Sequence, residues 1–408
     1  MKYIITLIAL ICGIQASAQR CGTTEYTLNN TVAQFGGNKV ASPADGRDTI
    51  TDEVIVIPVV VHVLYNKSIE NISDAQILSQ IEALNQDYRR TNKDAANTPL
   101  PFRKAAADTR IVFCLAKVDP QGRPTTGIVR KFTKEPTFLA DDAMKFSSRG
   151  GDDAWDATKY LNIWVCNLFG RTLGYAVLPG SPANKDGVVI KYNVFGTTGT
   201  VTAPYNKGRT ATHEIGHWLG LRHLWGDADC GDDGIADTPP QQTSNSHCTT
   251  FPHVSACSVN EHGDMFMNFM DFSDDACMNM FTYGQKTAMR SLFAKGGSKN
   301  SFLNANVCDS SNAVAGPLPE ITEPEEILLS VYPNPFVNEI IVTGNNSMPL
   351  SGKKVKVFGA TGKLFYSQVM TTQKLNIRTD HLPAGMYLIR VEGESKTMVY
   401  KLIKQSKK

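Results

Sequence analysis

The chain has 408 residues, enough for two or three folded units, and 42% of them are hydrophobic and can supply those units with cores. The formal net charge of +2 creates no broad electrostatic field, which argues against nucleic acid or an anionic membrane surface as a partner. This composition also excludes a chain that is disordered throughout.

The first residues have the pattern of an export signal. Lys2 precedes a short apolar run (4–14), and Ala16 and Ala18 supply the small residues of a cleavage site. The run is well short of the roughly 20 residues that a membrane span needs. We therefore expect a secretory signal peptide at 1–18, and no other stretch qualifies as a membrane span.

The next part of the sequence predicts an arm and then an α/β domain. Residues 19–50 are rich in Gly, Asn, Thr and Ala without sustained periodicity, which indicates a prosegment or flexible arm. The β-branched run VIVIPVVVHVLY (54–65) predicts a buried strand, and an apolar stripe predicts a helix over 73–90, with Ser73 and Gln76 as a capping box. Later strands and the start of a second helix are expected, in order, at 110–118, 160–168, 186–194 and Arg209.

A loop-rich region follows between Trp225 and Asp275. Gly, Asp, Pro, Asn, Ser and Cys dominate it, so we expect an irregular subdomain held by cross-links. Export permits disulfides, and two bridges are expected among Cys230, Cys248, Cys257 and Cys277, with three pairings open from spacing alone. Cys114 and Cys166 lie in apolar, strand-like stretches and are expected to be buried free thiols. Cys308 has no assignment.

The last hundred residues predict a separate β unit. Residues 309–326 are rich in Pro, Ser and Glu and are typical of a linker. From 327 to 408, short β-prone runs alternate with turn signals, which predicts a small all-β sandwich. The runs are 327–332, 339–343, 354–358, 363–369, 386–391 and 397–403.

The stretch HEIGHWLGLRH (213–223) carries the strongest chemical signal. His213 and His217 are four residues apart, so on a helix both imidazoles project from one face. Gly220 can adopt the left-handed conformation that ends the helix, which brings His223 in as a third ligand. Three imidazoles on zinc leave a fourth position for water, and Glu214 is placed to accept the proton of that water.

Ordinary helix-surface histidines are the alternative interpretation of this motif. The remaining histidines considered have no metal spacing and are treated as structural or solvated; they are His62, His247, His253 and His262.

Five motifs in this order give the chain a family resemblance: LNIWVC, HEIGHWLGLRH, DGIADTP, NFMDF and DDACMNMFT. Together they resemble the pappalysin family of metzincin zinc peptidases. The resemblance implies a catalytic domain at 51–308 with a mixed, mostly parallel twisted sheet, helices, and an irregular lower subdomain stabilised by disulfides and calcium. The residues that it implies are the zinc ligands His213, His217 and His223, the general base Glu214 and the methionine-turn residue Met270.

The resemblance also implies cross-links and a second metal in the loop region. The family's bridges correspond to Cys230–Cys257 and Cys248–Cys277. The acidic loop CGDDGIADTPP (230–240) resembles a segment that binds one or two structural calcium ions, since hard oxygen ligands suit Ca²⁺. The candidate ligands are Asp232, Asp233, Asp237 and Thr238. A solvated turn with an Asp cap is the alternative.

The resemblance further implies a substrate preference. Asp275 corresponds to an acid at the bottom of the pocket for the residue just after the cleaved bond, which favours Arg and then Lys there. The strand DGVVIKYNVFG (186–196) resembles the edge strand that holds an extended substrate, although a plain structural edge strand is equally compatible. Phe272 departs from the family, which commonly has Tyr at that position to stabilise the tetrahedral intermediate, so either a slower enzyme or a substitute donor is expected.

Cys21 in the arm acquires a role from this zinc site. A thiolate is a good fourth zinc ligand, so Cys21 can occupy the water position and keep the enzyme latent, as prosegment cysteines do in relatives. The preference for basic residues suggests that the Gly46–Arg47 bond is the activation site. An unpaired thiol with no role is the alternative.

The tail (327–408) resembles the immunoglobulin-like C-terminal sorting domain of type IX secretion cargo; a generic immunoglobulin-like binding module is the alternative. The expected protein is therefore a secreted or surface-bound zinc endopeptidase, with protein or peptide substrates and the type IX machinery as partners. Two other function classes are a catalytically weak or inactive surface binding module and a calcium-dependent adhesin.

Overall fold

The computed structural model describes residues 20–29, 53–309, 329–344, 352–360, 362–372, 374–392 and 397–406. The chain divides into two compact units, 1–318 and 319–408, which are described separately. The expected signal peptide, the Gly46–Arg47 bond and nearly all of the expected linker lie outside the described residues. Within the described ranges, no helix is long and apolar enough to cross a membrane.

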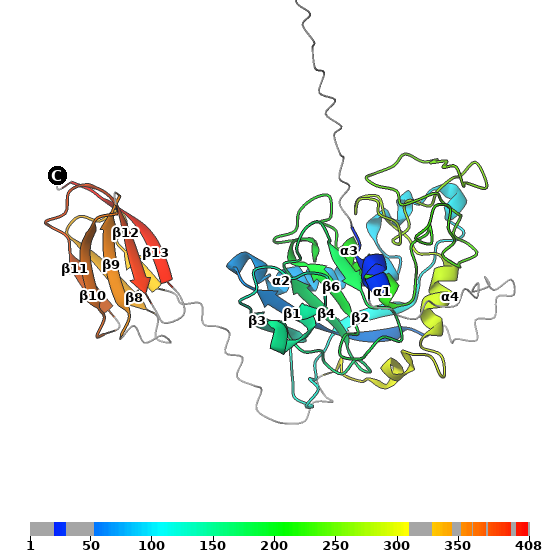
Figure 1. The fold of residues 1–408 in the computed structure, drawn as a ribbon, viewed down its shortest axis with the longest axis horizontal. Coiled ribbons are helices and arrows are strands. Elements are labelled where there is room, and N and C mark those ends of the chain that lie inside the picture. The colour runs from blue at the N-terminus through cyan, green and yellow to red at the C-terminus, as the bar shows by residue number, and fades with distance from the viewer. Residues whose placement is uncertain are drawn as a thin grey trace, which may run out of the picture. The chain divides into compact units, whose positions relative to one another are not determined.

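A six-stranded sheet forms the centre of the first unit (Figure 1). Its strands are β1 (Ile55–Tyr65), β2 (Ile111–Leu115), β3 (Ile128–Phe132), β4 (Leu161–Cys166), β5 (Gly174–Ala176) and β6 (Val188–Lys191). The spatial order is β2-β1-β4-β6-β5, and β3 pairs with the second half of β1. All pairs are parallel except β5 with β6, which confirms the expected mixed, mostly parallel sheet.

The edge strand is not the one expected from the sequence. β6 lies between β4 and β5, so the stretch 186–196 contains an interior strand and the expectation of an edge there was wrong. The edge beside the site is β5, whose three residues are too short to give a periodic signal.

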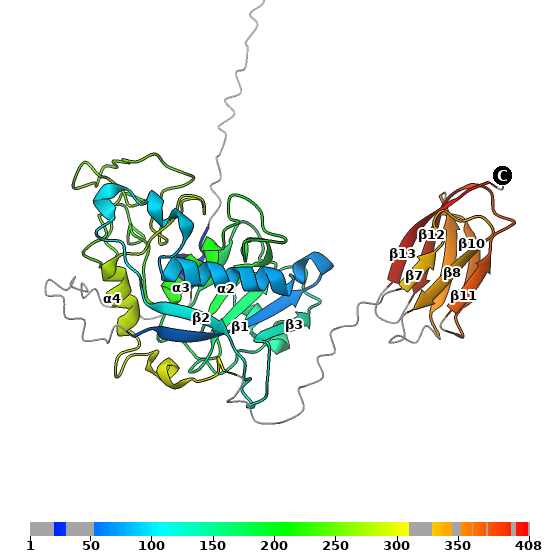
Figure 2. The same cartoon turned by 180° about the vertical axis from the view of Figure 1, so that it is seen from behind.

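Apolar side chains cover both faces of the sheet. Nearly all residues of β1 are buried, as expected for the central strand of a parallel sheet that is packed on both sides. One face carries the main core with α2 (Asp74–Tyr88), and Figure 2 shows this helix lying across β1 and β2. The other face carries a smaller core around Trp164 and Tyr175.

The remaining helices are short. The α-helices are α1 (Thr23–Asn29), α3 (Arg209–Trp218) and α4 (Tyr283–Ser291), and the 3-10 helices are η1 (Ser68–Glu70), η2 (Lys93–Asn97), η3 (Leu100–Phe102), η4 (Ala143–Lys145), η5 (Ser147–Arg149), η6 (Tyr192–Val194) and η7 (Asn300–Asn304). Ser73 caps α2 by accepting from the Gln76 N–H at 3.2 Å. Gln76 does not return the bond, because its side chain instead donates to the carbonyls of Tyr192 and Phe195 after β6.

Residues 219–282 contain no helix or strand, in agreement with an irregular subdomain. Two disulfides fasten it, Cys230–Cys257 and Cys248–Cys277, the pairs that the resemblance implies. A third bridge joins Cys114 to Cys308. The expectation of a free thiol at Cys114 was therefore wrong, because its partner is 194 residues away and no local pattern reveals it. Cys166 is a buried free thiol, as expected.

The second unit is built entirely of strands in the described residues. They are β7 (Leu329–Tyr332), β8 (Glu339–Gly344), β9 (Lys354–Gly359), β10 (Leu364–Val369), β11 (Lys374–Arg378), β12 (Gly385–Glu392) and β13 (Thr397–Lys404). They form two antiparallel sheets, β10-β9-β12-β13 and β11-β8-β7, which share one hydrophobic core. The sequence had suggested six of these strands and missed β11, whose charged ends hide its short apolar centre.

Candidate metal centre and active site

Helix α3 and the turn after it bring three histidines together. His213 and His217 lie one helical turn apart, and their Nε2 atoms are 3.1 Å from each other. Gly220, with φ +87°, then reverses the chain. As a result, the Nε2 of His223 lies 3.0 Å from that of His217 and 3.2 Å from that of His213.

The other ring nitrogens show that these three Nε2 atoms present lone pairs. The Nδ1 of His213 faces the Phe269 carbonyl at 2.7 Å, that of His217 faces the Leu221 carbonyl at 2.8 Å, and that of His223 faces Asp227 Oδ1 at 2.5 Å. Each Nδ1 therefore donates, which fixes the tautomer.

Three converging lone pairs repel one another unless a cation lies between them. Tetrahedral zinc with Zn–N bonds of about 2.0–2.1 Å places its nitrogen ligands about 3.3–3.4 Å apart, close to the observed spacing. The donor set therefore fits a zinc ion.

Met270 lies directly against the zinc helix. It is fully buried, and a Cβ added to Gly216 would come within 2.5 Å of its sulfur, so only glycine permits this contact. The Met270 N–H donates to Asn268 Oδ1 at 2.9 Å, which holds the turn. The structure thus brings Met270 to the triad, where the methionine turn is expected.

Glu214 lies beside the triad with one carboxylate oxygen unengaged. Its Oε2 accepts from the Thr23 hydroxyl at 2.9 Å and from the Cys21 thiol at 3.3 Å, while its Oε1 has no hydrogen-bond partner among the described residues. Burial raises the pKa of Glu214 to about 8. A carboxyl group in this environment is suited to taking up and releasing a proton.

Cys21 completes the histidine cluster. Its Sγ and the three imidazoles have ligand atoms within 4.8 Å of one another, and among the described residues this is the one group of three or more metal-binding side chains found. Cys21 is 3% exposed, and burial together with the neighbouring Glu214 raises its pKa. Bound zinc opposes this effect, because it favours the thiolate.

The segment around Cys21 pairs with the edge strand β5. The Gly22 N–H donates to the Gly174 carbonyl at 2.9 Å, and the Leu173 N–H donates to the Arg20 carbonyl at 3.3 Å. The Thr23 hydroxyl accepts from the Ala176 N–H at 2.9 Å. The bonding groups at this edge are therefore occupied by the arm.

Asp275 lies at the N-terminus of α3 and holds Arg20. One carboxylate oxygen accepts from the backbone N–H groups of Lys207 and Arg209, at 2.8 and 3.2 Å. The other lies 3.0 Å from the Arg20 guanidinium, which also donates to the Ser273 carbonyl and lies over the Tyr205 ring. Arg20 and Asp275 are both almost completely buried.

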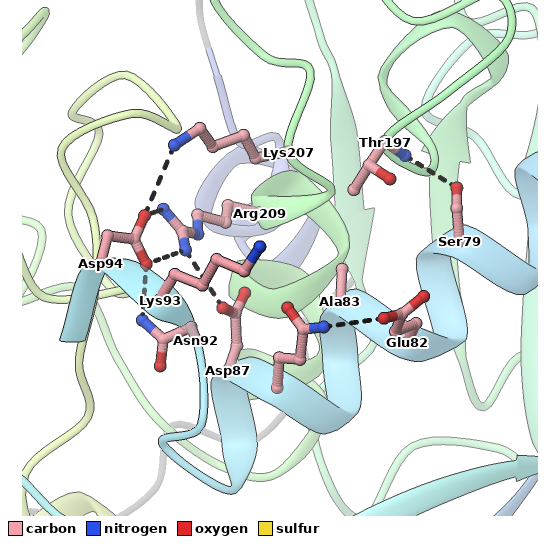
Figure 3. A pocket seen from close by; sticks show the side chains of 11 residues that line it. Ser79, Glu82, Ala83, Asp87, Asn92, Lys93, Asp94, Thr197, Lys207 and Arg209 are labelled. Carbon is pink, nitrogen blue, oxygen red and sulfur yellow. Dashed lines mark hydrogen bonds and ion pairs between the residues drawn. The ribbon is translucent and has the colours of Figure 1, made fainter.

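A second guanidinium, that of Arg209, also contacts Asp275. Arg209, the first residue of α3, donates to the Asp275 carbonyl at 2.5 Å and to both oxygens of Asp94 at 2.7 Å. It also forms an ion pair with Asp87 at 3.3 Å. Figure 3 shows these groups lining an open pocket together with Lys207, whose ammonium pairs with Asp94.

Phe272 packs on the metal-binding side chains. Its ring centroid is 4.9 Å from that of His223 and 4.9 Å from that of Trp225, both edge to face. Phe272 therefore presents an apolar ring, without a hydroxyl, beside the triad.

The acidic loop is ordered mainly by its own hydrogen bonds. Asp237 accepts from the Thr282 hydroxyl and the Gly284 N–H, so it caps α4. Asp233 Oδ1 accepts from Thr238, whereas its Oδ2 is buried without a partner in the described part of the chain, and burial raises the pKa of Asp233 to about 7. Asp232 accepts from the Gly234 N–H. The three carboxylates do not gather into one cluster.

Several site residues were not anticipated from the sequence. They are Arg20, Thr23, Asp94, Arg209 and Asp227. Arg20 had one signal, its place directly before the candidate ligand Cys21. Asp227 lies only four residues after His223, so its contact is local. Thr23, Asp94 and Arg209 act through contacts with residues distant in the sequence, which no local pattern displays.

A zinc-dependent peptidase is the class of protein that this fold and site define, because a helix-borne histidine triad and a buried carboxylate lie beside the edge strand of a mixed sheet. Comparison with known proteins agrees. The family described as pregnancy-associated plasma protein-A peptidases matches residues 147–294, and the family described as the secretion system C-terminal sorting domain matches residues 330–405.

Individual relatives point the same way. Mature mirolysin of Tannerella forsythia, solved in complex with a cleaved peptide, is 51% identical, with a TM-score of 0.62, over 63% of this chain and 99% of that one. A promirolysin mutant from the same organism is 51% identical, with a TM-score of 0.62, over 63% of this chain and 87% of that one. Extracellular metalloprotease 1 of Coccidioides posadasii is 34% identical over 54% of this chain and 70% of its own length.

The chain belongs to the pregnancy-associated plasma protein-A family of metallopeptidases, the pappalysins. It is a secreted zinc metallopeptidase, and its sorting domain implies export through the type IX secretion system.

Proposed function

We propose that this secreted peptidase is made as a latent zymogen and that, once activated, it cleaves protein chains before Arg and, less readily, before Lys. The observation that supports this most directly is the placement of two adjacent residues of the arm. Cys21 points at the histidine triad, and Arg20 pairs with Asp275. One short segment thus covers both the metal site and a buried acid beside it.

In this proposal His213, His217 and His223 hold one catalytic zinc, which supplies Lewis-acid activation of water and of the substrate carbonyl. Glu214 takes the proton of the attacking water and delivers it to the leaving amine. Its unpartnered Oε1 suits both transfers, since the group must take up the proton of the water and then release it.

Latency follows from what the arm occupies. The Cys21 thiolate takes the fourth zinc position, and the Thr23 hydroxyl donates to Glu214 Oε2. The same segment pairs with β5, the edge to which an extended substrate would add as a strand. Metal, base and substrate strand are therefore blocked together until the Gly46–Arg47 bond is cut.

The preference for Arg follows from the contacts of Arg20. Once Arg20 has left, Asp275 offers the oxygen that it held, and the Ser273 carbonyl offers a second acceptor to the same guanidinium. The Tyr205 ring adds a surface for a flat cation. Lys has a single ammonium and no fork, so it can use fewer of these contacts.

Two further features belong to the proposal. The acidic loop binds calcium, with Asp233 as the best-supported ligand because its Oδ2 is buried without a partner among the described residues. The two sheets of the tail form an immunoglobulin-like sandwich. The proposed organisation is signal peptide 1–18, prosegment 19–50, catalytic domain 51–308, linker 309–326 and sorting domain 327–408.

Phe272 favours a second candidate, a catalytically weak surface module. The position beside the triad that commonly carries a hydroxyl donor in the family carries an apolar ring here. Against it, Glu214 is retained with an oxygen ready for proton transfer, and binding alone does not require a base.

Casein zymography separates these functions. Activated wild type should clear the gel, and Glu214→Ala or a zinc chelator should abolish clearing, whereas a binding module clears nothing in any lane. Peptide-library profiling of the active enzyme then tests the specificity. We expect Arg, then Lys, after the scissile bond, and loss of this preference in Asp275→Ala; an apolar preference would contradict the assignment of Asp275.

A further inference from the structure

A second buried site lies next to the cleft and takes no part in the chemistry described above. Tyr26 of α1 is 3% exposed, and its hydroxyl donates to Asp142 Oδ2 at 2.6 Å. Its ring lies 5.0 Å from the ring of Tyr175 on β5, and the Lys145 ammonium lies 5.5 Å above it. We call this surround, formed by Asp142, Lys145, Lys185 and Tyr175, the tyrosine socket.

The residues of the tyrosine socket contact one another through groups other than Tyr26. Asp142 is held by the ammonium groups of Lys145 and Lys185, at 2.9 and 3.1 Å, and by the Tyr175 hydroxyl at 3.1 Å. Lys145 is completely buried and also donates to the Lys185 carbonyl at 2.9 Å. When Tyr26 leaves, the socket keeps its charges and its aromatic wall but exposes an acceptor on Asp142.

The path of the arm locates the tyrosine socket relative to the scissile bond. Arg20 occupies the pocket for the residue after the cut, and Cys21 lies at the metal. The arm then follows β5 from Leu173 to Ala176, and Tyr26 docks against the residue between Gly174 and Ala176. The socket is therefore on the side of substrate residues that precede the scissile bond.

Chain geometry narrows the position. From Cys21 to Thr23 the arm advances two steps of at most about 3.6 Å, and the helix then advances three steps of about 1.5 Å, so Tyr26 lies at most roughly 12 Å along the cleft. An extended substrate covers that span in about three residues.

We propose that, after the prosegment has left, the tyrosine socket binds a substrate tyrosine located two to four residues before the scissile bond. The proposal rests on the latency and cleavage proposed above. It gives the enzyme a second specificity determinant on the side of the metal opposite to Asp275.

The chemistry of the tyrosine socket separates tyrosine from its close analogues. A phenol donates a charge-assisted hydrogen bond to Asp142, which is worth about ten-fold or more in binding. Phenylalanine fills the same space but leaves the buried Asp142 oxygen without that donor. Phosphotyrosine has no hydroxyl to donate, and its phosphate would have to displace Asp142 from the two ammonium groups that already pair with it, so it should bind worst.

The test uses the full chain after proteolytic activation and fluorogenic peptides with Arg fixed after the scissile bond. Tyr, Phe, phosphotyrosine or Ala is placed in turn two, three and four residues before that bond. At one of these positions we expect kcat/KM for Tyr to exceed that for Phe by about ten-fold, with phosphotyrosine below Phe. Equal values for Tyr and Phe at all three positions would overturn the proposal on the wild-type enzyme alone.

Two variants then assign the effect to the carboxylate. Asp142→Asn should bring the Tyr-to-Phe ratio toward one, because a charged acceptor is replaced by a neutral one. Asp141→Asn is the matched control: this neighbouring carboxylate is about half exposed and pairs with Arg149, outside the socket, so the ratio should not change. An unchanged ratio in a folded Asp142→Asn enzyme would assign the preference elsewhere and overturn the socket.

The outcomes also distinguish the tyrosine socket from the proposed function on which it rests. If the Ala peptides are cut before Arg in a Glu214-dependent manner while Tyr gives no advantage, only the tyrosine socket is wrong. If no peptide is cut before Arg, the proposed function and the tyrosine socket fail together.

Discussion

Replacing Arg20 by alanine tests whether the specificity pocket contributes to latency as well as to substrate choice. Arg20 and Asp275 are 1% and 0% exposed and lie 3.0 Å apart. Removing one partner of such a buried pair costs about 3–5 kcal/mol. Water can enter the emptied pocket, so we take the lower figure of about 3 kcal/mol, which corresponds to about a 150-fold larger open fraction of the zymogen.

The assay measures peptide hydrolysis by the uncut zymogen. Arg47→Ala is added to block cleavage at Gly46–Arg47, and the rate is expressed relative to the same concentration of activated wild type. Arg20→Ala should raise this residual activity about 150-fold, and Arg20→Lys, which keeps the charge, should raise it less. Residual activity equal to that of the Arg47→Ala parent would refute the role of Arg20 in latency.

Other measurements test single contacts. Phe272→Tyr should raise kcat, by up to about a hundredfold if the missing hydroxyl limits turnover; unchanged kcat would show that it does not. Asp94→Asn leaves the charge of Arg209 less balanced beside Asp275, so kcat/KM for Arg peptides should fall. A ten-fold loss corresponds to a substrate cation about 12 Å from the lost charge at an effective dielectric near 20. Glu82→Gln, in the same pocket but away from Arg209, is its control. Burial alone would raise the pKa of Asp142, but Lys145 and the Tyr26 hydroxyl hold it below its ordinary value. The stability this contributes is present above about pH 4 and is lost as the pH falls through the lower folded pKa. These contacts should therefore lower the pH at which the zymogen begins to unfold in acid. Asp142→Asn removes the titrating carboxyl group, so it should weaken the dependence of the zymogen's melting temperature on pH in this range.

The metal site could be predicted because its geometry is local. A separation of four residues on a helix places His213 and His217 together, and one glycine suffices to bring His223 to them. The buried central strand could likewise be read from the apolar run 54–65, whereas the mixed sheet was implied by the family resemblance.

Contacts between distant segments could not be predicted in this way. The Cys114–Cys308 bridge spans 194 residues, and the edge strand β5 has only three. Arg209 looks like an ordinary first-turn residue until the fold places Asp94 and Asp275 around it. The relation between Arg20 and Asp275 depends on the arm folding back over the finished cleft, which is a property of the tertiary structure.

The coordination of zinc in the full-length, uncut chain tests the central claim most directly. X-ray absorption at the zinc edge should show three nitrogen neighbours at about 2.0–2.1 Å and one sulfur at about 2.3 Å, and activation should replace the sulfur by oxygen. A zymogen whose zinc has no sulfur neighbour, or the same spectrum in Cys21→Ala, would contradict the claim that Cys21 holds the enzyme latent.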